Sequence, residues 1–142
     1  MIDEGNVEAV RAAVAALNDG DIDGYLRHFE RSCHRWIAGL DRPFGLDDIA
    51  DNLHHLLSAF DRLRLDEEAI FGADGLVCAR WCLRGAHVNE FLDLAATGCE
   101  IAVQSCEVYA LTGSRVTEVW TYQDPLEIFR QIGAVPRGGA AA

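Results

Sequence analysis

Residues 99–124 read CEIAVQSCEVYALTGSRVTEVWTYQD, and this stretch decides the fold. Apolar and polar side chains alternate through 99–111 and again through 115–124, which is the pattern of half-buried β-strands. Between the two runs, Thr112-Gly113-Ser114 is typical of a tight turn. The stretch is therefore predicted to form a hairpin of two long antiparallel strands.

A second hairpin is predicted upstream of the first. Residues 63–71 and 77–83 alternate in the same way, and Gly72-Ala73-Asp74-Gly75 supplies the reversal between them. Residues 89–98 read as the loop that connects the two hairpins. Four strands thus occupy the second half of the chain.

Helical spacing dominates the first 60 residues. Val7, Val10, Val14 and Leu17 form one face of an amphipathic helix, and similar stripes predict helices over 22–29 and 46–60, with a short strand over 33–38. After the last strand, Pro125 is expected to open a short helix that ends near Gly133.

Helices first and long hairpins later indicate an α+β fold, with a single domain over 1–136 and a flexible tail at 137–142. A strongly bent antiparallel sheet wrapped over helices would enclose a cone-like cavity. Such a cavity is a natural site for a small molecule, mostly apolar with a few polar groups.

Charge and composition exclude several kinds of partner and site. The net charge of −11, from 23 acidic and 12 basic residues, would repel nucleic acid and anionic membranes. No stretch resembles a secretory signal or a membrane span, so we expect a cytoplasmic protein. The five cysteines lack the spacing of a zinc site and suit reduced thiols, and we expect neither a metal nor a cofactor.

Strand parity groups the polar residues that are able to do chemistry. Trp120, Tyr122 and Asp124 share one face of the last strand, and Gln104 and Cys106 share one face of the strand before it. Parity alone leaves open which face of each strand lines the cavity.

Asp124 has two interpretations. Asp124-Pro125-Leu126-Glu127 reads as a helix start with a capping acid, and backbone N–H bonds of that kind lower the pKa of a carboxylate. As a general acid/base among apolar side chains, Asp124 would instead need a raised pKa. The spacing supports both readings equally.

The second half of the chain also resembles a known family. The features that carry the resemblance are Arg84-Gly85-Ala86-His87-Val88, Ala96-Thr97-Gly98, Gln104, Gly113, Trp120, Asp124 and Phe129-Arg130-Gln131-Ile132-Gly133. They resemble the SnoaL-like polyketide cyclases, a branch of the nuclear transport factor 2-like superfamily.

The resemblance implies a cone-shaped α+β barrel, a homodimer, and a cofactor-free aldol cyclisation or isomerisation of a polyketide-like carbonyl compound in antibiotic biosynthesis. It also implies that Asp124 is the catalytic acid/base and Gln104 a pocket glutamine that steadies the enolate. Cys106 stands where the family carries a histidine, which favours a changed reaction.

Further candidates for substrate binding are the aromatic and imidazole side chains Trp36, His34, His87, Trp120 and Tyr122, together with Cys106. For His87 a structural hydrogen bond is the alternative, and for Trp36 an ordinary place in the core. Two other functions stay open: a polyketide hydroxylase component, and a non-catalytic small-molecule binding or self-resistance protein.

Overall fold

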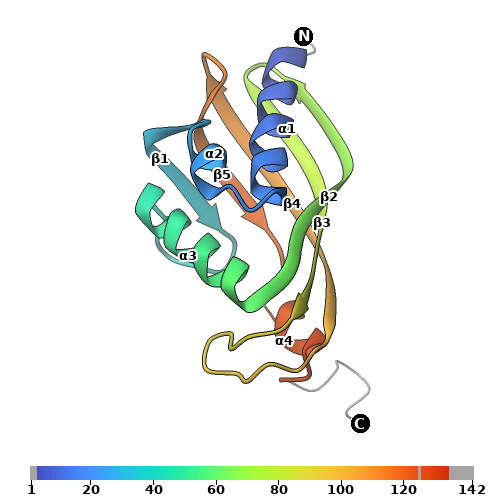
Figure 1. Cartoon of the computed structure of the whole chain (residues 1–142). Coiled ribbons are helices and arrows are strands. Elements are labelled where there is room, and N and C mark those ends of the chain that lie inside the picture. Colours follow the sequence, from blue (N-terminus) through green and yellow to red (C-terminus); the bar gives the residue numbers. More distant parts are fainter. Residues whose placement is uncertain (1–2, 125, 135–142) are drawn as a thin grey trace.

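A curved five-stranded sheet carries three helices on one face in the computed structural model, which describes residues 3–124 and 126–134 (Figure 1). In chain order the elements are α1 (Glu4–Asn18), α2 (Ile22–Leu26), β1 (Phe29–Ile37), α3 (Leu46–Ala59), β2 (Phe60–Ala73), β3 (Leu76–His87), β4 (Glu100–Thr112), β5 (Arg115–Tyr122) and α4 (Glu127–Gln131). The α+β prediction and both hairpins are confirmed.

The sheet has the strand order β1-β5-β4-β3-β2. The pairs β2–β3, β3–β4 and β4–β5 are antiparallel, whereas β1 runs parallel to β5. The expectation of an entirely antiparallel sheet is therefore wrong at this edge. Side-chain alternation is the same in parallel and antiparallel strands, so it does not reveal how β1 pairs with a strand so distant in the sequence.

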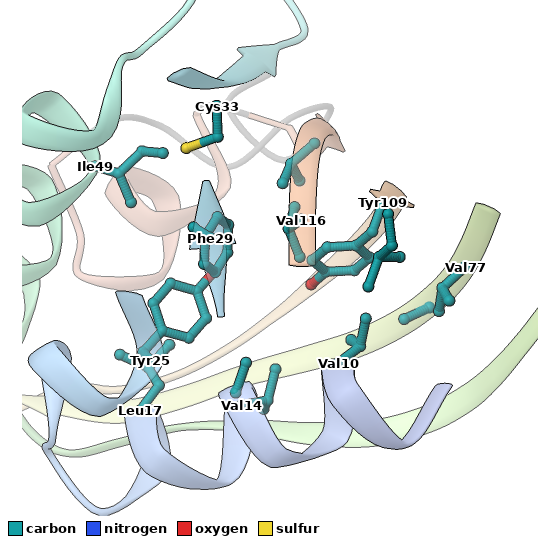
Figure 2. Close-up of a cluster of buried hydrophobic side chains, with 14 of the residues drawn as sticks. Val10, Val14, Leu17, Tyr25, Phe29, Cys33, Ile49, Val77, Tyr109 and Val116 are labelled. Atoms are coloured by element: carbon teal, nitrogen blue, oxygen red, sulfur yellow. The ribbon is translucent and has the colours of Figure 1, made fainter. Parts of the chain in front are cut away.

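The main core lies between the sheet and α1–α3. Val10 and Val14 of α1 point toward Val77 and Tyr109 of the sheet, and Tyr25 projects into the same cluster (Figure 2). The helical stripe predicted for α1 is thus its buried face. The N-cap residue of the helix is Asp3, whose side chain accepts a hydrogen bond from the backbone N–H of Asn6.

A second buried cluster occupies the other end of the sheet, where the 88–99 loop and α4 close the fold (Figure 1). Here Phe91 packs against Phe60, with ring centroids 5.3 Å apart, and against Phe129 at 5.9 Å. An interior space is left between this cluster and the main core.

The sheet bends sharply where β2 begins. The β2–β3 register shifts between Asp61 and Arg64, and Arg62 adopts a left-handed backbone with φ 53°. A Cβ at Gly85 would meet the Cβ of Phe60 at 3.2 Å, so a larger residue there would force β2 and β3 slightly apart.

The last helix begins at Glu127 with Leu126 as its N-cap residue, two positions later than the predicted cap at Asp124. Pro125 and the predicted tail at 137–142 lie outside the described residues. All five cysteines are free.

Candidate active site

An apolar cavity of about 230 Å³ lies between the inner face of the sheet and α3. Its polar or charged lining comes from Tyr25, Arg35, Asn52, Arg64, Ser105, Glu107, Thr121 and Gln123, and the apolar lining includes Leu53, Leu63, Leu83, Phe91 and Ile128. Ser105 and Glu107 of β4 and Thr121 of β5 therefore face the cavity. Their even-numbered neighbours face outward.

Glu107 is the only carboxylate among the residues that line this cavity. Its side chain is held from two strands, because the Tyr109 hydroxyl donates to Oε1 at 2.6 Å and the Thr121 hydroxyl donates to Oε2 at 2.8 Å. The residue is only 5% exposed. A buried carboxylate is costly unless such donors replace water, and both of its oxygens have one here.

Arg35 reaches the same wall from β1 and is 8% exposed. Its Nη2 donates to the hydroxyl oxygen of Tyr25 at 2.7 Å and lies 3.7 Å from Oε2 of Glu107. Nε of Arg35 is buried and has no hydrogen-bond partner in the part of the chain that the structure describes. The guanidinium therefore retains unused donor capacity beside the cavity.

Burial determines the protonation of the two phenols. It raises the pKa of Tyr25 against the opposing effect of the Arg35 charge, and burial together with the Glu107 charge raises the pKa of Tyr109 well above its ordinary value. Burial also opposes a charged Arg35, but the surrounding Tyr25 and Glu107 leave its pKa raised overall. Near neutral pH the site holds neutral phenols and a guanidinium cation.

Comparison with known proteins identifies the family of this chain. The family model described as SnoaL-like polyketide cyclase matches residues 7–132. This chain belongs to the SnoaL-like polyketide cyclase family. No curated protein matches it.

Solved structures agree with the SnoaL-like fold. AclR of Streptomyces galilaeus, a proposed hydroxylase, superposes with a TM-score of 0.86 at 21% identity and covers 94% of this chain and 98% of its own. IdmH of Streptomyces antibioticus, a proposed polyketide cyclase, gives 0.79 at 19%, covering 90% and 98%. A proposed SnoaL-like cyclase from Jannaschia sp. CCS1 gives 0.82 at 22%, covering 95% and 96%. The cone-shaped, nuclear transport factor 2-like fold is confirmed.

Asp124, the predicted catalyst of this SnoaL-like chain, does not lie in the apolar cavity. Its side chain is 49% exposed at the end of β5. Oδ1 accepts the backbone N–H of Leu126 at 2.9 Å, and Oδ2 pairs with Arg130. The hydrogen bond from the Leu126 amide makes the largest contribution to lowering the pKa of Asp124, and the hydrogen bond from Arg130 lowers it further. Asp124 therefore has the exposed, hydrogen-bonded setting of the capping interpretation and not the apolar setting that a raised pKa would need.

Gln104 and Tyr122 come together with Asp124, but around an open recess outside the sheet. Cys106 and Trp120 share this outward parity: Cys106 is paired with Tyr122, and Trp120 with Val108. The recess and the cavity meet only at Gln123, which borders both. These residues therefore do not line the cavity that was expected to hold the substrate.

The remaining candidates also lie away from the cavity lining. Trp36 and His34 are on the outer face of β1, where both contact Glu118, Trp36 through Nε1 at 2.7 Å and His34 through Nδ1 at 3.4 Å. His87 is completely buried, and its Nδ1 is 3.0 Å from Oγ1 of Thr97. The structural hydrogen bond considered for His87 is thus present.

Sequence reasoning missed Arg35 and Glu107. Both stand at strand positions whose parity matches buried neighbours: Cys33 for Arg35, and Val103 and Tyr109 for Glu107. A charged residue on the buried face of a strand is uncommon unless it is paired. The sequence contains this signal, but using it requires knowing which face of each strand is buried.

Two further properties concern the described residues as a whole. They contain no group of three or more His, Cys, Asp or Glu side chains arranged to hold a metal ion. Within the same ranges, no helix is both long and apolar enough to cross a membrane.

Proposed function

We propose that this protein is an enzyme that performs acid/base chemistry on a compact polyketide-like carbonyl compound, with Glu107 as the base. One observation carries the proposal: a buried carboxylate and a buried guanidinium–phenol pair share the wall of an apolar cavity. Pockets that combine apolar walls with a few convergent polar groups are the usual sites for small molecules.

Oε2 is the oxygen of Glu107 suited to exchange a proton with a ligand. Its neighbours Thr121 and Arg35 both line the cavity, whereas Tyr109, which holds Oε1, does not. A carboxylate oxygen has two lone pairs, so Oε2 can accept a proton while Thr121 remains bonded to it. General base catalysis by a positioned carboxylate requires this combination of access and fixed orientation.

Tyr25 is the donor for the carbonyl oxygen of the substrate. Its hydroxyl oxygen accepts a hydrogen bond from Arg35, which leaves its own proton for a ligand. The Arg35 cation behind the phenol strengthens that donor in a water-poor setting. Negative charge that develops on a carbonyl oxygen would therefore be stabilised from this side.

The reaction step follows from these roles. Glu107 removes a proton from the carbon next to a carbonyl group, and the C–H electron pair becomes an enolate that Tyr25 and Arg35 stabilise. The enolate carbon attacks a second carbonyl of the same molecule, and Glu107 returns the proton to the alkoxide. The chain contains no lysine, so no lysine imine is available as an alternative route.

A second candidate function is a hydroxylase component. The observation that favours it is the superposition with AclR at a TM-score of 0.86, since that protein is a proposed hydroxylase. A hydroxylase would consume molecular oxygen in proportion to substrate. Acid/base cyclisation would leave oxygen unchanged, so an oxygen electrode separates the two functions.

The proposal also includes assembly as a homodimer in the cytoplasm. An apolar row crosses all five strands on the face that the helices leave open, with Trp36, Trp120, Val108, Cys78 and Phe71 as successive register partners. Trp36 is 40% exposed and Phe71 66%. Contiguous apolar surface of this kind favours a partner, and the row offers the same surface to a second copy.

The test follows the exchange of hydrogen at carbon. 2-Tetralone, a bicyclic ketone, is incubated with the protein in D₂O, and loss of its α-proton signals is followed by NMR. Wild-type protein and a Glu118→Gln control on the outer face should accelerate exchange, and Glu107→Gln should not. No acceleration by the wild type, or equal acceleration by Glu107→Gln, would refute the proposal.

A further inference from the structure

The charges along the cavity wall cancel. Arg35 and Glu107 are buried next to each other and carry opposite charges, while the third charged lining residue, Arg64, is exposed and bonded to Asp66 at 3.1 Å. An anionic ligand that entered this setting would leave one negative charge unbalanced. Protonation of Glu107 would restore the balance and leave the ligand as the counter-ion of Arg35.

Arg35 has the free donors that such a ligand needs. Its described hydrogen bond goes to Tyr25, its Nε is buried without a partner, and Oε2 of Glu107 at 3.7 Å is beyond hydrogen-bond range. A guanidinium prefers to bond oxyanions with two parallel donors. Arg35 lines the cavity, so an enolate or phenolate oxygen there would meet the guanidinium, whose bond to Tyr25 uses one of its donors.

We propose that the cavity binds the ionised form of compact acidic carbonyl compounds, such as 1,3-dicarbonyl enolates, and that Glu107 takes up a proton when they bind. This inference rests on the proposed function, because the bound state matches the enolate intermediate in charge. The titratable or charged groups that contact Glu107 or share the cavity wall with it are Arg35 from β1, Tyr25 from α2, Arg64 from β2 and Tyr109 from β4. Helix α3 contributes no such group, because its cavity residues are Asn52, Leu53 and Leu56.

The cavity also limits the size of the ligand. Its volume of about 230 Å³ lies below the common range of small-molecule pockets, about 300–1,000 Å³. On the sheet side, the hydrogen bond from Thr121 to Glu107 links two adjacent strands of the wall. Ligands of one or two fused rings fit this space better than extended tetracyclic compounds.

The experiment uses 1,3-indandione, a two-ring 1,3-dicarbonyl, at a pH where it is ionised in solution. Calorimetry in buffers of different ionisation enthalpy gives the number of protons taken up on binding. Wild-type protein and the Glu118→Gln control should take up roughly one proton per ligand, by linkage to Glu107. Glu107→Gln is already neutral, so it should bind without uptake and at least as tightly as the wild type.

Arg35 is tested with the same ligand and with 1-indanone, a neutral ketone of the same skeleton. Arg35→Gln should weaken indandione binding by about tenfold or more, as expected for a lost charged hydrogen bond, and change 1-indanone binding much less. Arg80→Gln, an exposed arginine on β3, is the matched control. If Arg35→Gln does not fold, the uptake measurement on Glu107→Gln decides alone.

Proton uptake that persists in Glu107→Gln, or the absence of uptake in the wild type, would overturn the inference. These outcomes can be told apart from a failure of the proposed function, because that function is tested by α-proton exchange. Exchange without proton uptake would remove only this inference, and uptake without exchange would remove only the catalytic proposal.

Discussion

Thr121 lies directly opposite Glu107 in the β4–β5 ladder and donates its hydroxyl to Oε2 at 2.8 Å. The pair connects two adjacent strands on the cavity side of the sheet. One position further along, Cys106 faces Tyr122 on the outer side. A shift of one residue along either strand moves a side chain from the cavity to the outer face. Strand parity therefore decides which residues line the site.

Replacing Thr121 with valine tests how far the buried carboxylate depends on this bond. Valine keeps the shape but removes the donor, so the free energy of unfolding should fall by about 1–3 kcal/mol. Urea unfolding measures the change. Thr117→Val is the control, because Thr117 bonds only the carbonyl of Ala110 and should cost less. Equal losses in both variants would contradict the account.

The Arg35–Glu107 pair should behave as a coupled unit. Arg35→Met leaves a buried charge without its partner and should destabilise the protein by about 3–5 kcal/mol, whereas Arg35→Met combined with Glu107→Leu should recover much of that loss. A double-mutant cycle by urea unfolding gives the coupling. Additive effects would show that the two charges do not interact across 3.7 Å.

Tyr25 and Tyr109 should resist ionisation at alkaline pH. A phenol whose pKa is raised in the folded state contributes stability below its unfolded pKa of about 10, and that stability is lost as pH rises through the folded pKa. Replacing either tyrosine with phenylalanine should therefore leave the phenolate absorbance near pH 10 unchanged while the protein stays folded. A clear loss of absorbance would contradict the assignment.

Asp124 should act on stability through its lowered pKa. Its carboxylate stabilises the folded state above the ordinary Asp pKa of about 3.9, and this contribution disappears as pH falls through the lower folded value. Asp124→Asn should thus be less stable than the wild type at pH 7, and the difference should vanish in acid. Arg130→Gln should show the same trend, since Arg130 is the partner of Asp124.

The apolar row on the open face predicts the dimer surface. Val108→Arg places a charge in the middle of the row and should shift the protein from dimer to monomer in sedimentation experiments. A stable interface typically needs about 800 Å² from each partner, and the substitution removes the centre of that surface. Thr112→Arg, at the end of the same strand, is the control and should remain dimeric. A wild-type monomer would contradict the proposed assembly.

Much of the fold was predictable from local patterns. Helical stripes located α1 and α3, and alternation around the glycine turns located both hairpins, because burial of one face imposes those periods. The parallel pairing of β1 with β5 was not predictable, since it depends on contacts between distant segments. Parity grouped the residues of β4 correctly but left open which group faced inward, and in β2 the register shift between Glu67 and Ala69 places Phe71 on the face opposite Leu63.

Because the inward-facing group was not identified, the predicted catalytic residues came from the outward-facing groups. Asp124 and Gln104 follow the family resemblance, but both carry outward parity, and Asp124 functions structurally in binding Leu126 and Arg130. Glu107 and Arg35 carry inward parity and meet only when β1, β4 and β5 assemble. A catalytic role for Asp124 stays a prediction that competes with the role proposed for Glu107.

The most direct test compares these two carboxylates in the same assay. The rate of α-proton exchange of 2-tetralone in D₂O is measured for wild type, Glu107→Gln and Asp124→Asn, each checked for folding by circular dichroism. The account predicts a loss of about 10²-fold or more for Glu107→Gln, as is usual for a general base, and a rate within about twofold of wild type for Asp124→Asn. A folded Asp124→Asn variant that loses exchange, while Glu107→Gln retains it, would contradict the account.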